Sequence, residues 1–331
     1  MKIKLVHCYS EIVSVDNLLL AWAKFVSGKR DKPDVQRFGL NLMDNIFDLH
    51  MDLVSKSYRH GGYKAFKVFD PKPRDIHKAS VRDRLLHHAV YRILYPFFDR
   101  KFASDSYSCR NKKGTHKAVD KLLKYFYLAS KNNTKTCYAL KLDIRKFFAN
   151  IDHGIMLSIL REYIADEDCL WLLENIISSF QSKDPNSKIR PLRSTGSIGL
   201  PLGNLTSQLL VNIYMNKFDQ FVKHELREKY YIRYADDFVF LDEDYHRLDN
   251  LISSIRLFLK ESLKLEIHPD KIYIKTIPSG LDFLGYVSFP DHRILRTKTK
   301  RRLFARISDE NLSSYLGLLK HCNSHKISKN L

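Results

Sequence analysis

The sequence predicts an α+β fold, with a sheet-bearing central region and helical regions before and after it. Two observations predict this class. The N-terminal stretch has apolar residues at helical spacing and the C-terminal stretch is basic and helical, whereas short segments between them alternate as strands do. Strands and helices also do not alternate strictly, as they would in a parallel α/β fold. With 331 residues, 44% of them hydrophobic, the chain can bury a substantial core.

The first part of the chain, from Ser14 to about Arg59, is predicted to be helical. Two apolar faces, separated by the polar loop SGKRDKP, are interpreted as core: Leu18, Leu19, Trp22 and Phe25 on one helix, and Leu42, Ile46, Leu49 and Leu53 on the next. Residues 63–76 predict a strand, a turn and a strand (YKAFKV, DPKP, RDI). Residues 80–130 predict helices with an interruption near 104–114.

The central region contains the predicted sheet. Residues 137–143 alternate and predict a half-buried strand, with Ala139, Lys141 and Asp143 on its polar face. Asp152 is placed to cap the helix HGIMLSILREYI, residues 178–199 predict a loop, and 205–226 have helical periodicity. Residues 231–234 and 238–241 flank Ala-Asp-Asp, which predicts a tight hairpin with acids at its tip.

The C-terminal third continues with a helix at about 247–263, a short strand and the hairpin-like GLDFLGYVSF. From about Arg293 the chain is basic and predicted to be helical.

Composition limits the partners and the compartment. The net charge of +19 favours a polyanion, because Lys and Arg that neutralise phosphates release bound counterions. Five scattered cysteines without a CxxC pair argue against a zinc site or a disulfide framework and favour a reducing compartment. No signal peptide is apparent, and no apolar run approaches the roughly 20 residues of a membrane helix. We therefore expect a cytoplasmic protein without a membrane partner.

Three acids suggest the chemistry. Asp143 ends a predicted strand, and Asp236 and Asp237 tip a predicted hairpin; two adjacent strands would bring their carboxylates together. Such a cluster is tolerable when cations bind between the charges. Two divalent ions held by carboxylates are what phosphodiester formation requires. Taken alone, each acid is more simply a turn or cap residue.

The residues around these acids resemble a known family. LDIRKFFANID (142–152), GLPLGNLTSQ (199–208), YADD (234–237) and FLGY (283–286), together with PKPR (71–74) and SYSCR (106–110), have the order and spacing of reverse transcriptase motifs. The resemblance implies a right-hand polymerase fold. Its parts would be an N-terminal helical extension (1–60), fingers (61–135), a palm (136–290, with a fingers insertion at about 155–200) and a thumb (291–331).

The resemblance also assigns roles at the metal site. Asp143, Asp236 and Asp237 would be catalytic and would bind two Mg²⁺ ions, for which Mn²⁺ can substitute, with the Ile144 carbonyl as a further ligand. Phe148 would meet the sugar 2′ position and select deoxynucleotides; core packing is the alternative, and it holds for Phe147.

Further residues are predicted to bind the deoxynucleoside triphosphate. Lys72 and Arg74 match basic positions that hold the triphosphate, and Lys271 matches a lysine that protonates the pyrophosphate leaving group. Gly203 would permit close backbone approach, and Leu202 stands where most of the family has Gln. Ser207-Gln208 replaces the usual Ser-Pro; Gln208 completes the predicted nucleotide site. For the lysines, an ordinary surface position is the alternative.

Primer and template contacts are predicted in the C-terminal part. The segment Phe283-Leu284-Gly285-Tyr286 matches a hairpin that grips the primer end, with core packing as the alternative for Phe283 and Leu284. The basic residues Lys298, Lys300, Arg301 and Arg302 would contact phosphates without reading sequence. The role of Arg110 stays open, and the histidines form no recognisable triad or metal pattern.

In detail the chain resembles reverse transcriptases of diversity-generating retroelements. This implies error-prone copying of a template RNA into cDNA, assisted by a small basic accessory protein oligomer, in a bacterial or phage-encoded context. A retron-type or defence-associated reverse transcriptase is the main alternative. A group II intron enzyme is less favoured, since no maturase or endonuclease extension is seen. A non-catalytic RNA-binding relative is a further alternative, although all three acids are present.

Overall fold

The computed structural model describes residues 4–69, 73–182 and 197–325. The chain divides into two compact units. The first unit comprises Met1–Phe102, Lys146–Phe218 and Ser262–Leu265, and the second comprises Ala103–Arg145, Asp219–Glu261 and Glu266–Leu331. Each unit is therefore built from segments that are far apart in the sequence.

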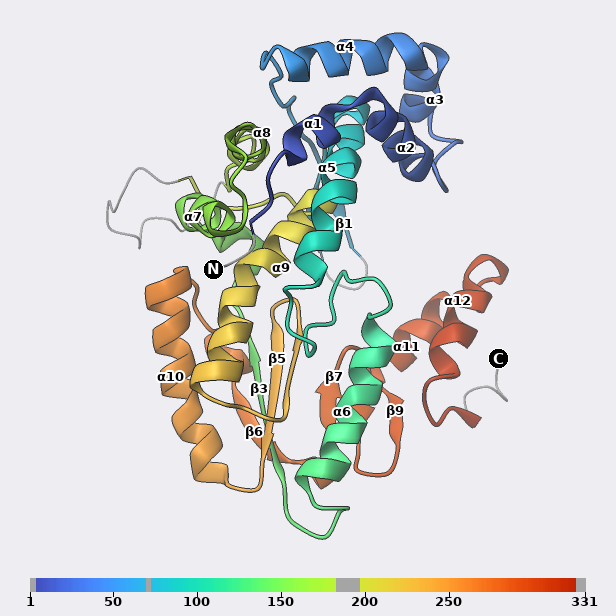
Figure 1. The fold of residues 1–331 in the computed structure, drawn as a ribbon. Coiled ribbons are helices and arrows are strands. Elements are labelled where there is room, and N and C mark those ends of the chain that lie inside the picture. The colour runs from blue at the N-terminus through green and yellow to red at the C-terminus, as the bar shows by residue number, and fades with distance from the viewer. Residues whose placement is uncertain (1–3, 70–72, 183–196, 326–331) are drawn as a thin grey trace. The chain divides into compact units, whose positions relative to one another are not determined.

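The first unit is mainly helical (Figure 1). Its elements are α1 (Cys8–Val13), α2 (Val15–Phe25), α3 (Pro33–Leu40), α4 (Leu42–Val54), β1 (Lys64–Val68), β2 (Arg74–Lys78), α5 (Val81–Asp99), a 3₁₀ turn (Phe147–Asn150), α7 (His153–Tyr163), α8 (Glu167–Ser178) and α9 (Leu205–Gln220), which runs on into the second unit. The structure confirms the predicted helices and the paired strands β1 and β2. It also confirms the helix cap at Asp152, whose side chain accepts a hydrogen bond from the Ile155 amide. Pro33, the last residue of the predicted loop SGKRDKP, instead begins α3, because proline suits the first position of a helix.

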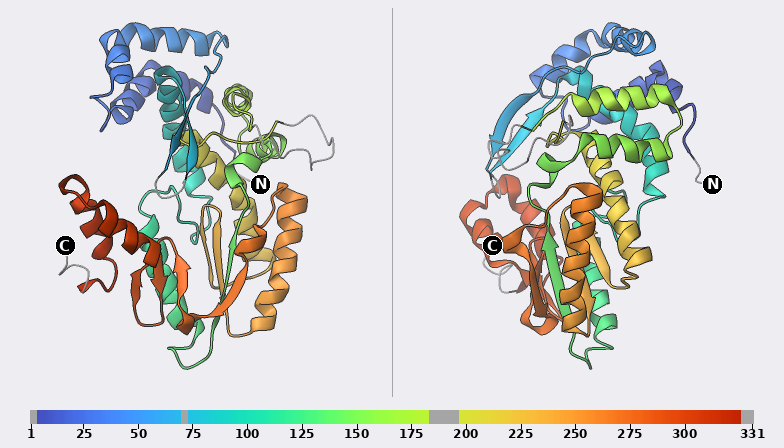
Figure 2. Two further views of the ribbon diagram at one scale, coloured as in Figure 1. Left: turned by 180° about the vertical axis from the view of Figure 1, so that it is seen from behind. Right: turned by 90° about the vertical axis from the view of Figure 1, so that its left-hand side faces the viewer.

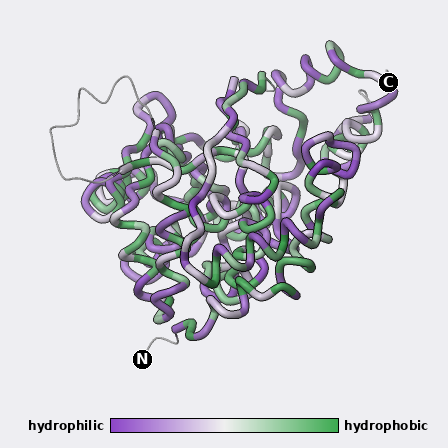
Figure 3. The backbone as a smooth tube through the Cα atoms, turned by 90° about the horizontal axis from the view of Figure 1, so that it is seen from above, coloured by the Kyte–Doolittle hydropathy of each residue, from purple (hydrophilic) through white to green (hydrophobic). Residues whose placement is uncertain are grey.

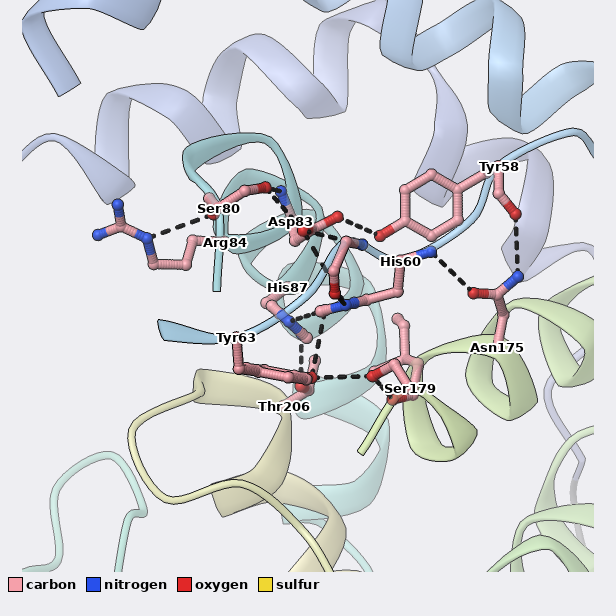
Figure 4. A network of polar contacts seen from close by, with 12 residues as sticks. Tyr58, His60, Tyr63, Ser80, Asp83, Arg84, His87, Asn175, Ser179 and Thr206 are labelled. Carbon is pink, nitrogen blue, oxygen red and sulfur yellow. Dashed lines mark hydrogen bonds and ion pairs between the residues drawn. The ribbon is translucent and has the colours of Figure 1, made fainter. Parts of the chain in front are cut away.

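A buried polar network joins the segment after α4 to three helices of the first unit (Figure 4). Tyr58 donates to Asp83 of α5 at 2.7 Å. A ring nitrogen of His60 lies 3.1 Å from His87 of α5, whose other ring nitrogen lies 2.6 Å from the Thr206 hydroxyl of α9. Asn175 of α8 donates to the Tyr58 carbonyl. These contacts fix α5, α8 and α9 around residues 58–63.

The second unit contains both of the larger sheets. Its elements are α6 (Thr115–Ala129), β3 (Tyr138–Asp143), a π-helical turn (Phe221–Glu225), β4 (Tyr231–Tyr234), β5 (Asp237–Asp242), α10 (Tyr245–Leu263, ending in the first unit), a 3₁₀ turn (Pro269–Lys271), β6 (Tyr273–Thr276), a 3₁₀ turn (Ile277–Ser279), β7 (Leu281–Phe283), β8 (Tyr286–Ser288), β9 (Arg293–Leu295), α11 (Thr297–Arg306) and α12 (Asp309–Leu319). Mixed helices and antiparallel sheets confirm the predicted α+β class.

The four-stranded sheet has the order β4-β5-β3-β6 and is antiparallel throughout. Helices α6 and α10 lie on either side of it (Figures 1 and 2). Lys141 and Asp143 of β3 are partly exposed, as the predicted half-buried strand requires, but Ala139 on the same face is fully buried. Its face packs against α6 in a core that includes Val119, Leu122 and Val239. The alternation indicated the strand but not the helix that covers it.

The three-stranded sheet, β7-β8-β9, extends the predicted hairpin by one strand. Residues 293–295, predicted to begin a helix, pair with Tyr286–Ser288 instead, and Leu295 is buried in the same core. The helical C-terminal region therefore begins only at Thr297. A short strand with one buried residue has too little periodicity to be distinguished from a helix start.

Hydropathy varies within single helical turns, so purple and green alternate along the tube in Figure 3, as amphipathic helices require. Over the described ranges, every helix is too short or too polar to cross a bilayer.

Candidate active site

Asp143 and Asp237 lie directly opposite each other in the second unit. Asp143 is the last residue of β3 and Asp237 the first of β5, and the antiparallel register pairs them. Side chains of directly paired residues project from the same face of a sheet. The two carboxylates therefore share one face at one edge of the four-stranded sheet.

The turn between β4 and β5 places Asp236 next to this pair. Ala235 has a left-handed backbone, with φ of 54°, and the Ile144 amide donates to the Asp236 carbonyl at 3.1 Å. On its other side the Asp143 carbonyl accepts from the His268 amide at 2.8 Å. The three predicted catalytic aspartates are thus brought together by backbone hydrogen bonds between β3, the turn and the segment after α10.

Two lysines lie against these acids. The Lys271 ammonium nitrogen is 2.6 Å from Asp143 Oδ1. The Lys141 nitrogen is 3.4 Å from Asp237 Oδ1 and also donates to the Asp282 carbonyl at 3.0 Å. The ammonium groups thus offset part of the negative charge that the acids concentrate here.

Crowding of the carboxylates changes their proton affinity. Burial, together with the negative charges of Asp143 and Asp237, raises the pKa of Asp236 to about 6. Burial also raises the pKa of Asp237, although the nearby Lys141 opposes this shift. Such electrostatic stress is relieved when a cation binds between the acids.

The donor set fits a hard cation such as Mg²⁺, which prefers carboxylate oxygens and retains water or substrate oxygens. Among residues 4–69, 73–182 and 197–325, no three His, Cys, Asp or Glu side chains are already arranged to hold a metal ion. The ammonium groups contact two of the acids instead. The ligand set, including the buried Ile144, stays a prediction.

The first unit gathers most of the residues predicted to bind nucleotide. Phe148 is half-buried beside Phe147. Its carbonyl accepts a hydrogen bond from the Leu200 amide at 2.8 Å. Two residues further on, the Leu202 carbonyl accepts from the His77 amide of β2 at 3.0 Å. Backbone hydrogen bonds therefore link the 3₁₀ turn, the segment before α9 and the β1–β2 hairpin.

Other nucleotide-site predictions have mixed outcomes. Arg74 begins β2 and is exposed, and Gln208 is partly exposed on α9. Gly203 has φ of +115°, and a Cβ there would lie 3.1 Å from the Ile76 side chain, so its backbone and packing already require glycine. Lys72 lies outside the described residues. A cavity of about 470 Å³ in this unit, lined by Arg59, His60 and Trp171 among others, contains none of the predicted residues.

The predicted primer-gripping hairpin is a real hairpin, β7–β8, but its aromatic side chains belong to the core. Phe283 and Tyr286 are buried, and the Tyr286 hydroxyl donates to the Leu318 carbonyl at 3.1 Å. The turn residues Leu284 and Gly285 both have positive φ. Any contact with a primer is therefore confined to this turn rather than to the two aromatic rings.

The basic residues of α11 are on its outer side. Lys298, Lys300 and Arg301 are exposed and Arg302 is partly exposed, whereas Leu303 is buried. Lys298, Arg301 and Arg302 follow the spacing i, i+3, i+4 and so share one face of the helix. Arg110, whose role was left open, donates to the Ala103 and Ser106 carbonyls of its own loop.

Sequence reasoning missed Lys141 as a partner of the acids and Arg233 beside the hairpin turn. Both had a detectable signal, a cationic residue inside an otherwise apolar strand. Without the register of the strands, however, the signal does not reveal what the charge contacts.

Comparisons with known proteins identify a family and several relatives of this chain. A family model described as reverse transcriptase (RNA-dependent DNA polymerase) matches residues 69–288. Protein YkfC of Escherichia coli (strain K12) is 25% identical over 308 residues, covering 81% of this chain and 77% of that protein. The group II intron-encoded protein LtrA of Lactococcus lactis subsp. cremoris is 23% identical over 233 residues, covering 69% of this chain and 37% of that protein.

Two further similarities extend over longer proteins. A putative COX1/OXI3 intron 1 protein of Saccharomyces cerevisiae is 24% identical over 324 residues, covering 95% of this chain but 34% of that protein. Among solved structures, telomerase from Candida albicans with a fragment of telomeric RNA has a TM-score of 0.49 and 13% identity, covering 75% of this chain and 50% of that one. The chain thus spans about a third of the length of LtrA and of the yeast intron 1 protein.

Proposed function

Because the chain belongs to the reverse transcriptase (RNA-dependent DNA polymerase) family, a right-hand polymerase fold, we propose that it copies a template RNA into cDNA at Asp143, Asp236 and Asp237. The observation that supports this most strongly is the pairing of Asp143 with Asp237 across β3 and β5, with Asp236 in the adjoining turn. Three acids from two distant segments meet at one sheet edge. A structural role alone would not require them to be together.

In this proposal the three aspartates, with the Ile144 carbonyl, hold two Mg²⁺ ions. When bound, these ions lower the pKa of an attacking 3′-hydroxyl and stabilise the leaving pyrophosphate. The chain supplies few ligands, as Mg²⁺ sites completed by substrate phosphates require. We propose that Lys271, whose ammonium nitrogen lies 2.6 Å from Asp143 Oδ1, gives a proton to the leaving group.

The nucleotide would be selected by residues of the first unit. We propose that Phe148 excludes the ribose 2′-hydroxyl, that Arg74 and Lys72 bind the triphosphate, and that Leu202, Gly203 and Gln208 lie next to base and sugar. The support is local: hydrogen bonds bring Phe148, Leu202 and the β1–β2 hairpin together. The turn at Leu284 and Gly285 and the basic face of α11 would contact primer and template phosphates.

For the subtype we propose an error-prone enzyme of a diversity-generating retroelement, acting in the cytoplasm of a bacterium or of a phage-infected cell with a small basic accessory protein oligomer. Leu202 and the Ser207-Gln208 pair support this subtype. The similarity to LtrA and to yeast intron proteins is equally compatible with a retron-type, defence-associated or intron-related enzyme. A near-identical repeat pair in the neighbouring DNA, differing mainly at adenines, would distinguish the first subtype from the others.

The activity is tested by extending a DNA primer on an RNA template with Mg²⁺ and deoxynucleoside triphosphates. We expect extension by the wild type and none by Asp236→Ala. Asp242→Asn is a matched control, because Asp242 lies at the opposite end of β5, paired with Tyr138. A folded wild type without metal-dependent extension would refute the polymerase and leave a non-catalytic RNA binder. An active Asp236→Ala variant would refute the catalytic role of Asp236.

A further inference from the structure

Arg233 is a charged residue in the middle of β4, between Ile232 and Tyr234, and its side chain is fully buried. Burying an unpaired guanidinium is costly, so its partners must compensate the charge completely. On one side of the guanidinium, the carboxylate of Asp219 compensates the charge. The Nε and Nη2 atoms of Arg233 donate to the two carboxylate oxygens of Asp219 at 2.8 and 2.7 Å, and Tyr231 donates to the same carboxylate at 2.8 Å.

The remaining donors of Arg233 reach toward the catalytic turn and a neighbouring loop. Nη1 donates to the Ala235 carbonyl at 3.1 Å, one residue before Asp236, and Nη2 donates to the Ser106 hydroxyl at 2.9 Å. Ala235 is in the left-handed region, a conformation that is unfavourable for a residue with a Cβ atom. The turn that presents Asp236 therefore needs support from outside its own backbone.

The loop with Ser106 is itself fixed to β4. The Arg233 amide donates to the Asp105 carbonyl at 2.9 Å, and the Tyr107 amide donates to the Arg233 carbonyl at 3.0 Å. The segment 105–107 thus continues the sheet beyond β4. The first two residues of the SYSCR motif, Ser106 and Tyr107, therefore support β4, the strand that leads to Asp236 and Asp237.

We propose that Arg233, fixed by Asp219, is a positioning residue that holds the Ala235–Asp236 turn in the conformation that the metal-binding acids require. This inference rests on the polymerase activity proposed above. The Ile144 amide, directly after β3, donates to the Asp236 carbonyl, and Arg233 of β4 donates to the preceding carbonyl. Both carbonyls of the turn are thereby held.

The planar fork of arginine is essential to this role. It contacts Asp219, Ser106 and Ala235 simultaneously, which the single ammonium of lysine cannot do with the same geometry. Stability alone does not explain such a pair, since apolar residues replace buried ion pairs in other proteins without loss of stability. Arg233→Lys therefore keeps the charge opposite Asp219 and removes the simultaneous hold on the turn.

The test compares Arg233→Lys with Arg247→Lys in the full chain. Arg247 is the matched control, because it also joins two acids of the second unit, Glu228 and Asp242, at the end of β5 away from the turn. Four quantities are measured: the melting temperature, Mn²⁺ affinity by electron paramagnetic resonance, and kcat and KM for primer extension. For Arg233→Lys we expect Mn²⁺ affinity and kcat to fall at least tenfold, with KM for the primer–template unchanged. For Arg247→Lys we expect neither the Mn²⁺ affinity nor kcat to change more than twofold.

Two outcomes would overturn the proposal: an Arg233→Lys variant that loses only thermal stability, or equal loss of Mn²⁺ affinity in both variants. If Arg233→Lys does not fold, Ser106→Ala removes one partner of the same guanidinium, and a smaller fall in Mn²⁺ affinity is expected; no fall would refute the role. A folded wild type that neither binds Mn²⁺ nor extends a primer would refute the polymerase itself, whereas an active wild type with an unaffected Arg233→Lys refutes only the positioning role.

Discussion

The Lys271 ammonium nitrogen lies 2.6 Å from Oδ1 of Asp143, the acid that ends β3. Lys271 belongs to a short 3₁₀ turn whose backbone is tied to β3, because the neighbouring His268 amide donates to the Asp143 carbonyl. A lysine fixed in this way to a proposed catalytic acid has two possible roles. It can offset the negative charge of the acids, or it can supply a proton to the pyrophosphate leaving group.

Replacing Lys271 distinguishes these roles. If the lysine is a general acid, Lys271→Arg and Lys271→Met should both lower kcat by about 10²–10³-fold, because arginine keeps the charge but does not release a proton near neutral pH. Single-nucleotide incorporation under single-turnover conditions measures the effect. If Lys271→Arg retains nearly full kcat while Lys271→Met loses it, the role is charge compensation. A near-normal rate for both variants would make Lys271 an ordinary surface residue.

Phe148 is predicted to exclude ribonucleotides. Its half-buried ring packs edge-to-face on Phe147, with centroids 5.5 Å apart, and its carbonyl is bonded to the Leu200 amide. Phe148→Ala removes the ring and leaves that backbone contact possible. We expect ribonucleotide incorporation relative to deoxynucleotide incorporation to rise about tenfold to hundredfold, the range in which pocket shape discriminates between similar substrates.

The control for Phe148 is Phe147→Leu, at the buried neighbour. It should lower the melting temperature without changing the sugar preference. Phe148 would be a core residue only, as the alternative interpretation holds, if Phe148→Ala destabilised the protein and left the preference for deoxynucleotides intact.

Leu202 is predicted to relax base selection, because an aliphatic side chain offers no hydrogen bond near the nucleotide. Its carbonyl is held by the His77 amide at 3.0 Å, so a change of side chain should leave the backbone in place. We expect Leu202→Gln to lower misincorporation opposite template adenine about 2–10-fold, as one added hydrogen bond would. Sequencing of cDNA made on a defined RNA measures it. Leu202→Met, which adds no hydrogen-bonding amide, should leave the error rate unchanged; equal error rates in all three proteins would disprove the idea.

Part of this site followed from the sequence, and the rest depended on tertiary structure. Alternation predicted β3, and the apolar segments flanking Ala-Asp-Asp predicted the hairpin, so the meeting of Asp143 with Asp237 could be anticipated. The partners of Arg233 could not, because Asp219 and Ser106 come from separate segments that meet only in the folded second unit. For Phe283 and Tyr286 the motif position suggested a contact with the primer end, and only the packing against α6 shows that both rings lie in the core.

His87 should make the first unit sensitive to acid. Burial, together with the neighbouring His60 and His88, lowers its pKa to about 3. Below the ordinary histidine pKa of about 6.5, the unfolded chain therefore binds a proton at this residue that the folded chain does not. The contribution of neutral His87 to the free energy of unfolding is therefore complete above about pH 6.5. It is lost as the pH falls, by roughly 2 kcal/mol between pH 6 and pH 4.

His87→Asn tests this linkage, since an asparagine amide can keep a hydrogen bond to Thr206, which His87 makes through Nδ1. Urea unfolding at pH 6 and at pH 4 gives the free energy of unfolding of each protein. The loss between the two pH values should be smaller in His87→Asn than in the wild type. His246→Asn, at an exposed position of α10, should lose as much as the wild type. If the loss of unfolding free energy between pH 6 and pH 4 is the same in His87→Asn as in the wild type, His87 is protonated in the folded protein. The network of Figure 4 must then accommodate a buried positive charge next to Asp83 and His60.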